Sequence, residues 1–134
     1  MTRATVLLAD DHPVTAALLR QLLRPMFDVV GEVSDGLALV EAAGRLKPDV
    51  IVTDISMPGL DGIEATRRIL VMNATVCIVF VTVHSEPAVI ERAFAAGARA
   101  YVVKSIAADE LVPAIHSALR GDLPFSRLVD DETP

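Results

Sequence analysis

The stretch Asp49-Val50-Ile51-Val52-Thr53-Asp54-Ile55-Ser56-Met57-Pro58-Gly59 decides the fold of this 134-residue chain. Its β-favouring residues, Val50 to Thr53, predict a short strand buried on both faces, as in a parallel sheet. Pro58 and Gly59 then break the chain into a loop, because proline lacks an N–H donor and glycine tolerates unusual backbone angles. Asp54 is thereby placed at the carboxyl end of a strand, where open α/β sheets bind ligands. Taken alone, Asp54 is explained equally well as a turn cap.

Length, composition and charge narrow the class of protein. A chain of 134 residues fits one domain with a sizeable core, and a hydrophobic content of 52% argues against disorder. No apolar run reaches the roughly 18 residues of a membrane span, and the N-terminus shows no signal-peptide pattern. The single cysteine, Cys77, cannot form an internal disulfide, so we expect a cytoplasmic location. The net charge of −6 argues against nucleic-acid binding by this chain itself.

Strand-like and helix-like segments alternate along the chain. Apolar runs predict strands at residues 4–9, 29–33, 50–53, 75–83 and 99–103. Helical spacing predicts helices at residues 13–24, 37–46, 62–72, 86–96 and 109–120. This order predicts an α/β fold, a doubly wound (βα)5 arrangement whose five-stranded parallel sheet is covered by helices on both faces.

Finer details of the helices are predicted as well. We expect Val14, Ala17, Leu18 and Leu22 to form the buried face of the first helix. In the third helix, Ile63, Thr66, Ile69 and Leu70 should face inward, and Glu64, Arg67 and Arg68 outward. Asp61 should cap the third helix and Ser85 the fourth, since short polar side chains satisfy the free N–H groups of a first turn.

The helical periodicity ends at Gly121. The sequence Asp130-Asp131-Glu132-Thr133-Pro134 that closes the chain is typical of an acidic tail or the start of a linker. We therefore expect one domain over residues 1–121 and a tail or linker over residues 122–134.

Polar side chains gather where the predicted strands end. Asp10 and Asp11 follow the first strand, Asp54 the third, Thr82 ends the fourth and Lys104 follows the fifth. Three close carboxylates repel one another, and Mg²⁺, which prefers carboxylates, water and phosphate oxygens, relieves that repulsion. The sequence has no cluster of histidine and cysteine residues, so it does not indicate a zinc site. With Mg²⁺ present, a carboxylate can attack phosphorus and form an aspartyl phosphate, while a lysine neutralises the transferred group.

With these residues in place, the chain resembles a response-regulator receiver domain, the phospho-acceptor of two-component signalling, over nearly all of residues 4–121. The resemblance is carried by Asp10-Asp11, Asp54, Met57-Pro58-Gly59 with Asp61-Gly62, Thr82, and Tyr101-Val102-Val103-Lys104. The segments Asp10-Asp11-His12-Pro13 and Thr82-Val83-His84 are most similar to the LuxR/NarL-type subfamily. The resemblance implies a flavodoxin-like sheet with strand order 2-1-3-4-5.

The resemblance also implies a role for each site residue. Asp54 would be phosphorylated by a histidine kinase, and Lys104 would contact the phosphoryl group. Thr82 would move toward the phosphate, and Tyr101 would turn inward with it as a switch. The implied Mg²⁺ ligands are the side chains of Asp10, Asp11 and Asp54 and the backbone carbonyl of Ser56.

The implied protein is a phosphorelay signalling protein and not an enzyme, although it assists its own phosphorylation and dephosphorylation. Receivers often dimerise on phosphorylation, so a homodimer is a further expectation. The output would be transcription, through a C-terminal helix-turn-helix DNA-binding domain that is absent from this chain. The chain would then be a piece of a longer protein, with a stand-alone receiver as the alternative.

Two other functions are compatible with parts of the sequence, and two residues differ from the usual family pattern. A phosphohydrolase of another α/β family would also use an aspartate and Mg²⁺, but its usual Asp-x-Asp-x-[Thr/Val] pattern is absent at Asp54. A third reading is an interaction module that keeps the fold without phosphorylation. Ser105 stands where the family often has proline, and the bulk of Val83 is expected to narrow access for small phosphodonors. His12 and His84 flank the site, and either could tune hydrolysis of the phosphate; a solvated loop histidine is the alternative, favoured for His12 and equally plausible for His84.

Overall fold

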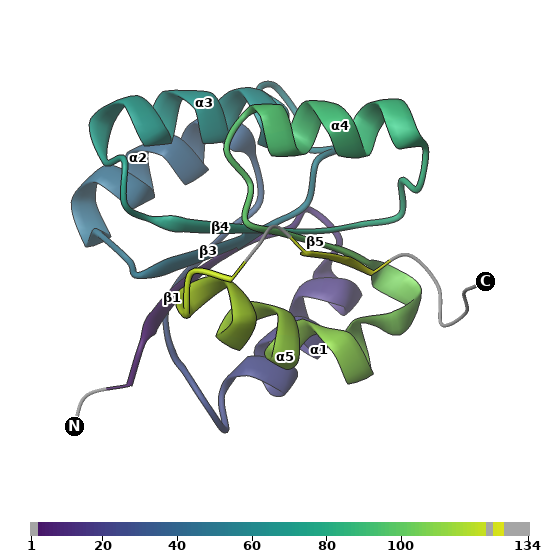
Figure 1. The fold of residues 1–134 in the computed structure, drawn as a ribbon. Helices are drawn as coiled ribbons and strands as arrows, with labels where there is room; N and C mark the ends of the chain where they lie inside the picture. The colour runs from purple at the N-terminus through teal and green to yellow at the C-terminus, as the bar shows by residue number, and fades with distance from the viewer. Residues whose placement is uncertain (1–2, 123–124, 128–134) are drawn as a thin grey trace.

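The computed structural model describes residues 3–122 and 125–127, and these form three layers with a central sheet between two sets of helices (Figure 1). Helices α2, α3 and α4 cover one face of the sheet, and α1 and α5 cover the other. The strands are β1 (Thr5–Ala9), β2 (Asp28–Val33), β3 (Val50–Thr53), β4 (Cys77–Thr82), β5 (Ala100–Val103) and β6 (Phe125–Arg127). The helices are α1 (Pro13–Leu23), α2 (Gly36–Leu46), α3 (Gly62–Met72), α4 (Pro87–Ala95), the 3-10 turn η1 (Lys104–Ile106) and α5 (Ala107–Leu119).

The sheet is parallel throughout, with the order β2-β1-β3-β4-β5-β6. The predicted order of the first five strands is confirmed. β6 is a sixth strand that the sequence did not predict, and it pairs with β5 from within the expected tail, residues 122–134. Residues 130–134 of that expected tail, which include its three acidic residues, lie outside the described residues.

The core consists of one apolar cluster on each face of the sheet. All four residues of β3 are buried, as predicted from their β-favouring run. Val50 and Val52 join the cluster under α1 and α5, whereas Ile51 joins the cluster under α2, α3 and α4. This split follows from strand geometry, since neighbouring side chains point to opposite faces. Asp54, the next residue after β3, is therefore attached to a strand that is buried along its whole length.

The predicted buried face of α1 is wrong for Val14 and Leu18, whereas Leu22 is partly buried against the core as predicted. The side chains that pack inward are Ala16, Leu19 and Leu23, whereas Val14 is 84% exposed and Leu18 is 48% exposed. Both sets have helical spacing, because α1 carries apolar residues around most of its circumference. Periodicity alone does not separate two such faces.

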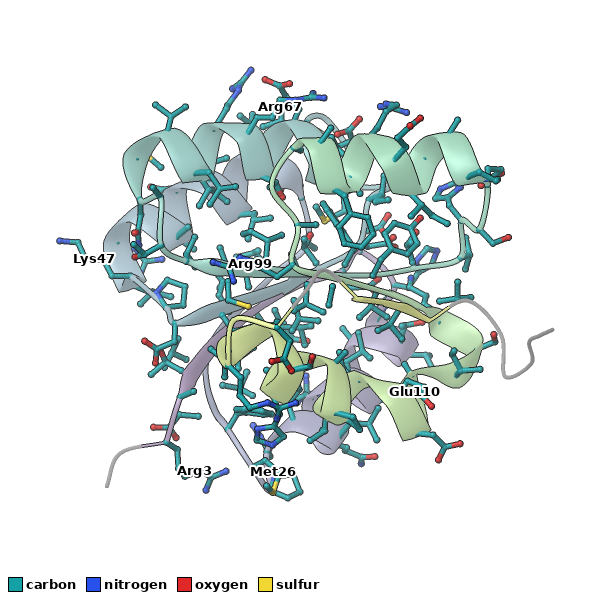
Figure 2. All side chains as sticks on the ribbon, in the orientation of Figure 1. Arg3, Met26, Lys47, Arg67, Arg99 and Glu110 are labelled. Carbon is teal, nitrogen blue, oxygen red and sulfur yellow. The ribbon has the colours of Figure 1, made fainter. Side chains whose placement is uncertain are left out.

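The predictions for α3 and α4 have different outcomes. In α3, Arg67 points away from the sheet (Figure 2), and Asp61 caps the helix by accepting a hydrogen bond from the Glu64 N–H at 2.8 Å, both as predicted. The predicted Ser85 cap of α4 is wrong: α4 begins at Pro87, and its N-cap residue, Glu86, makes no capping hydrogen bond through its side chain. Proline favours the first helical position, which makes the preceding residue the cap.

Gly62 lets the first turn of α3 pack directly on the end of β3. A Cβ atom at this position would lie 2.1 Å from the carbonyl oxygen of Asp54, a backbone atom that has no freedom to rotate away. We expect Gly62→Ala to lower the free energy of unfolding by about 1–3 kcal/mol, the usual range for overpacked sites, in urea denaturation. Gly44 in α2 is the matched control, because a Cβ atom added there would have no other atom within 4 Å. Gly44→Ala should instead raise stability by about 0.5–1 kcal/mol, and equal effects of the two substitutions would contradict the packing argument.

Within the part of the chain that the structure describes, no helix is long and apolar enough to cross a membrane.

Candidate functional site

Three carboxylates meet at the carboxyl edge of the sheet, because β1 and β3 are neighbours. Asp10 and Asp11 follow β1, and Asp54 follows β3. Asp10 and Asp54 are each only 3% exposed. One potential ligand atom from each of Asp10, Asp11, His12 and Asp54 lies within 4.8 Å of the others. The expected acidic cluster is therefore present as a group of closely spaced oxygen atoms.

Lys104 brings a positive charge to this cluster. It follows β5 directly as the first residue of η1, and its Nζ lies 2.8 Å from Oδ2 of Asp54 and 3.1 Å from Oδ2 of Asp10. Burial tends to lower the pKa of Lys104, but hydrogen bonds and charge attraction from Asp54 and Asp10 outweigh it, so the pKa lies above its ordinary value. The lysine therefore stays charged and pairs with two buried carboxylates at once.

Asp54 is held in a fixed orientation. One carboxylate oxygen, Oδ1, accepts a hydrogen bond from the Ile55 N–H at 2.7 Å, and the other, Oδ2, accepts from Lys104 at 2.8 Å. The Asp54 N–H donates to the Ala9 carbonyl at 3.0 Å, which ties the residue to β1. The Gly62 N–H donates to the Ile55 carbonyl at 2.8 Å and closes the loop behind it. Both oxygens are thus positioned before any reaction takes place.

The acidic cluster fits a hard divalent cation. Oδ1 of Asp11 is buried and makes no hydrogen bond to the residues that the structure describes, although it lies 3.3 Å from Nδ1 of His12. A buried carboxylate oxygen without a hydrogen bond is costly unless a cation or water compensates it. The donor atoms are mainly carboxylate oxygens, the ligand type that Mg²⁺ prefers.

The two predicted switch residues, Thr82 and Tyr101, both form hydrogen bonds with the main chain of His84. Thr82 is fully buried at the end of β4, and its Oγ1 accepts a hydrogen bond from the His84 N–H at 3.4 Å. Tyr101 on β5 is also fully buried, and its hydroxyl donates to the His84 carbonyl at 2.9 Å. The Tyr101 ring packs between Phe80 and Phe94, with both ring centroids 6.3 Å away. Thr82 and Tyr101 are therefore linked through the main chain of one residue.

The Tyr101 hydroxyl offers a direct test of this environment. Burial, then the negative charges of Glu86 and Asp54, raise the pKa of Tyr101 to about 12. It is the only tyrosine in the chain, and there is no tryptophan, so phenolate absorbance reports this group alone. We expect a midpoint near 12 in the folded protein and near the ordinary value of about 10 in urea.

The sign of the linked stability follows from this raised pKa. The neutral phenol stabilises the fold fully below the unfolded pKa of about 10, and this contribution disappears as pH rises through the folded value. Circular dichroism at each pH checks that the chain stays folded, and Glu86→Gln should lower the midpoint. A midpoint equal to that of the unfolded chain would contradict the buried, charge-flanked position of Tyr101.

The sequence did not predict the side-chain contacts of His84 with Ser56 and Glu86. Nε2 of His84 lies 2.7 Å from Oγ of Ser56, and Nδ1 of His84 lies 3.7 Å from Oε1 of Glu86. The sequence pointed to His84 and to the Ser56 carbonyl, but not to the Ser56 hydroxyl or to Glu86. No local pattern could have indicated this contact, because Ser56 and His84 lie 28 residues apart in different loops.

Other candidate residues lie away from the cluster or at its rim. His12 is the N-cap residue of α1, and its N–H donates to Oδ1 of Asp10 at 2.9 Å. His116 is half-buried on α5 and packs against Phe27, with ring centroids 5.3 Å apart. Cys77 is buried on β4, and burial raises its pKa to about 11.

Comparisons with known proteins agree on one family. Residues 6–116 match the model of the response regulator receiver domain. The response regulator UvrY of Escherichia coli (strain K12) is 41% identical over 118 residues, which cover 87% of this chain and 54% of UvrY. The nitrate/nitrite response regulator protein NarL of the same strain is 34% identical over 125 residues, which cover 92% of this chain and 58% of NarL. The chain thus spans just over half the length of these two relatives.

Comparison with solved structures supports the same family. A LuxR-family two-component response regulator from Aurantimonas sp. SI85-9A1 superimposes with a TM-score of 0.88 at 37% sequence identity. The match covers 96% of this chain and 92% of that one, so the likeness extends over the whole sheet and its helices.

Proposed function

This chain belongs to the response regulator receiver domain family, and from that premise we propose that Asp54 accepts a phosphoryl group from a histidine kinase. The observation that carries the proposal is the pairing of Lys104 with both Asp54 and Asp10 inside a cluster of three carboxylates. The buried charges, the oriented nucleophile and the oxygen ligands are the components that phosphoryl transfer requires.

In the proposed transfer, a carboxylate oxygen of Asp54 attacks the phosphorus of the kinase phosphohistidine. The new oxygen–phosphorus bond forms as the phosphorus–nitrogen bond breaks, and the imidazole leaves with the electron pair. The hydrogen bonds from Ile55 and Lys104 hold the attacking carboxylate in place. Lys104 also balances negative charge on the phosphoryl oxygens.

Mg²⁺ belongs to the same proposal. The residues that would hold it are Asp10, Asp11 and Asp54, together with the backbone carbonyl of Ser56. Bound there, the ion would supply positive charge toward the phosphoryl oxygens. The buried Oδ1 of Asp11, without a hydrogen bond among the described residues, supports this assignment.

We further propose that phosphorylation is sensed through Thr82 and Tyr101. A Thr82 hydroxyl that turns to donate to a phosphoryl oxygen would alter its hydrogen bond with the His84 N–H. Since the Tyr101 hydroxyl donates to the carbonyl of the same residue, a shift of His84 would reach Tyr101. The Tyr101 ring is already buried, so the change would concern its hydroxyl partner and the packing around β5.

The output and partners are proposals as well. Response regulators such as UvrY and NarL extend well beyond the matched region, so we propose that the receiver occupies residues 1–121 and controls transcription through a DNA-binding domain C-terminal to it. A homodimer formed on phosphorylation and a cytoplasmic location complete the proposal.

Intact-mass measurement tests the proposed function. The protein is incubated with Mg²⁺ and a small acyl phosphate, or with the phosphorylated catalytic part of a histidine kinase. We expect a gain of one phosphoryl group, and no gain when a chelator removes Mg²⁺. Absence of uptake from both donors, together with no response of the Tyr101 fluorescence to beryllofluoride, would overturn the proposal.

A further inference from the structure

A groove with two adjoining lobes lies at the amino edge of the sheet, at the opposite end of β3 from Asp54. Both lobes are lined by Lys47 and Pro48, which lead into β3, and by Asn73 and Val76, which lead from α3 into β4. Because these residues line both lobes, the lobes form one continuous groove. Their volumes are about 460 and 340 Å³, within the range of about 300–1,000 Å³ that is usual for small-molecule sites.

The first lobe is mainly apolar. It lies between the C-terminal ends of α2 and α3, and its apolar lining includes Ala43, Ile69, Met72 and Val76. Gly44 leaves free space in it, since a Cβ atom at this position would have no other atom within 4 Å. Met72 is 58% exposed, and its flexible, unbranched side chain can adapt to a bound molecule. This lobe suits the apolar part of a ligand.

The second lobe is more polar and carries two cations, Lys47 and Arg99. Figure 2 shows both side chains left of the centre of the molecule. Burial raises the pKa of the Cys77 thiol, and the charge of Arg99 acts against this rise, which places that charge near Cys77 in the same lobe. Neither Lys47 nor Arg99 forms an ion pair with a residue that the structure describes.

The balance of charge in the second lobe is positive. Its carboxylate, Asp49, already accepts hydrogen bonds through Oδ2 from the N–H and the hydroxyl of Thr5, at 2.8 and 3.1 Å. With Lys47 and Arg99, this lining has a net charge of +1 in a chain whose net charge is −6. The C-terminal ends of α2 and α3 add partial negative charge, but this effect falls off within the last turn and concerns the apolar lobe. An anionic group is therefore best placed between Lys47 and Arg99.

We propose that this groove binds a free amphiphilic anion, a small molecule with an apolar body and one carboxylate or similar group. The apolar body lies over Gly44 between α2 and α3, and the anionic group lies between Lys47 and Arg99. This division matches the usual form of ligand sites, which are largely apolar with a few polar groups that fix the orientation of the ligand. The inference does not depend on phosphorylation of Asp54, because the groove lies at the other end of the strands.

The test uses octanoate as the probe and octanol, which has the same hydrocarbon chain without the charge, as its matched control. Each is titrated into the ¹⁵N-labelled protein, and binding is followed by the chemical shifts of the backbone amides. We expect octanoate to shift the amides of Lys47, Asn73, Val76 and Arg99 and to bind about five-fold more tightly than octanol. A five-fold difference corresponds to about 1 kcal/mol, the upper value for an exposed ion pair.

Three variants test the two lobes separately. Lys47→Met and Arg99→Met should each weaken octanoate binding about five-fold and leave octanol binding unchanged. Gly44→Leu fills the apolar lobe from a position with free space, so it should weaken the binding of both compounds about ten-fold, the equivalent of two methylene groups left unburied. Arg45→Met is the matched control: Arg45 is exposed near the end of α2 but does not line the groove, so both affinities should stay at the parent level.

Four results would overturn the inference: no saturable shifts, shifts confined to other parts of the chain, equal affinities for octanoate and octanol, or an equal loss of octanoate binding in Arg45→Met. Co-sedimentation with phosphatidylglycerol vesicles that is lost in Arg99→Met would also overturn it, because the groove would then bind a membrane surface and not a free molecule. Asp54→Asn should bind octanoate as the parent does, so failure of the proposed phosphorylation would be distinguishable from failure of this inference.

Discussion

Asp54→Asn is expected to abolish phosphoryl uptake, so that the mass of the variant does not change under conditions where the parent gains one phosphoryl group. The amide that replaces the carboxylate is neutral and a poor nucleophile toward phosphorus. Its size is nearly the same, and its oxygen can still accept the hydrogen bond that the Ile55 N–H gives to Asp54. The loss should therefore reflect chemistry and not a collapsed site.

The matched control lies at the other end of the same strand. Asp49 precedes β3, and its Oδ2 accepts a hydrogen bond from the Thr5 N–H at 2.8 Å, far from the acidic cluster. Asp49→Asn should leave uptake at the parent level. Undiminished uptake by Asp54→Asn would contradict the assignment of Asp54 as the nucleophile. Uptake by the parent without Mg²⁺ would contradict the proposal that Asp10 and Asp11 bind a metal ion required for the transfer.

Lys104→Met is expected to cause the largest loss of stability from a single side chain of the site. It leaves Asp10 and Asp54 buried without the lysine that lies 3.1 and 2.8 Å from them. Removing one partner of a buried ion pair costs on the order of 3 kcal/mol, because the remaining charge is uncompensated. Urea denaturation at neutral pH should show this drop, and phosphoryl uptake should fall with it, since Lys104 balances charge on the transferred group.

Two comparisons isolate the electrostatic cause. Lys47, the other lysine of the chain, lies exposed at the end of α2 (Figure 2), and Lys47→Met should leave stability nearly unchanged. Adding Asp54→Asn to Lys104→Met should restore part of the lost stability, because one of the unpaired charges is removed. If Lys104→Met were as stable as the parent, the lysine would not be compensating the buried carboxylates.

The sheet and the acidic cluster could be predicted because their signals are local. Each strand is a short apolar run, and each site residue lies at or just beyond the end of such a run. Once the strands are parallel and adjacent, their carboxyl ends must share one edge, so Asp54, Asp10 and Lys104 meet there without further information. The strand order itself came from the family resemblance.

The features that the sequence did not reveal depend on contacts between distant parts of the chain. The buried face of α1 was missed because Val14 and Leu18 are as apolar as Leu19 and Leu23, and only the sheet decides which pair is covered. The contact between Ser56 and His84 depends on how two loops come together. β6 is only three residues long, and a segment of that length is too short to show the alternating pattern that predicts a strand.

The pairing of β6 with β5 affects whether the chain self-associates at high concentration. At the opposite edge of the sheet, β2 alternates between exposed and half-buried residues and carries Asp28 and Glu32, charges that discourage strand addition. All four residues of β5 are buried and apolar, so without β6 that strand would offer free N–H and C=O groups to any other chain. A chain ended at Gly121, where helical periodicity stops, should therefore self-associate through this edge, whereas a chain that keeps residues 125–127 has the edge covered.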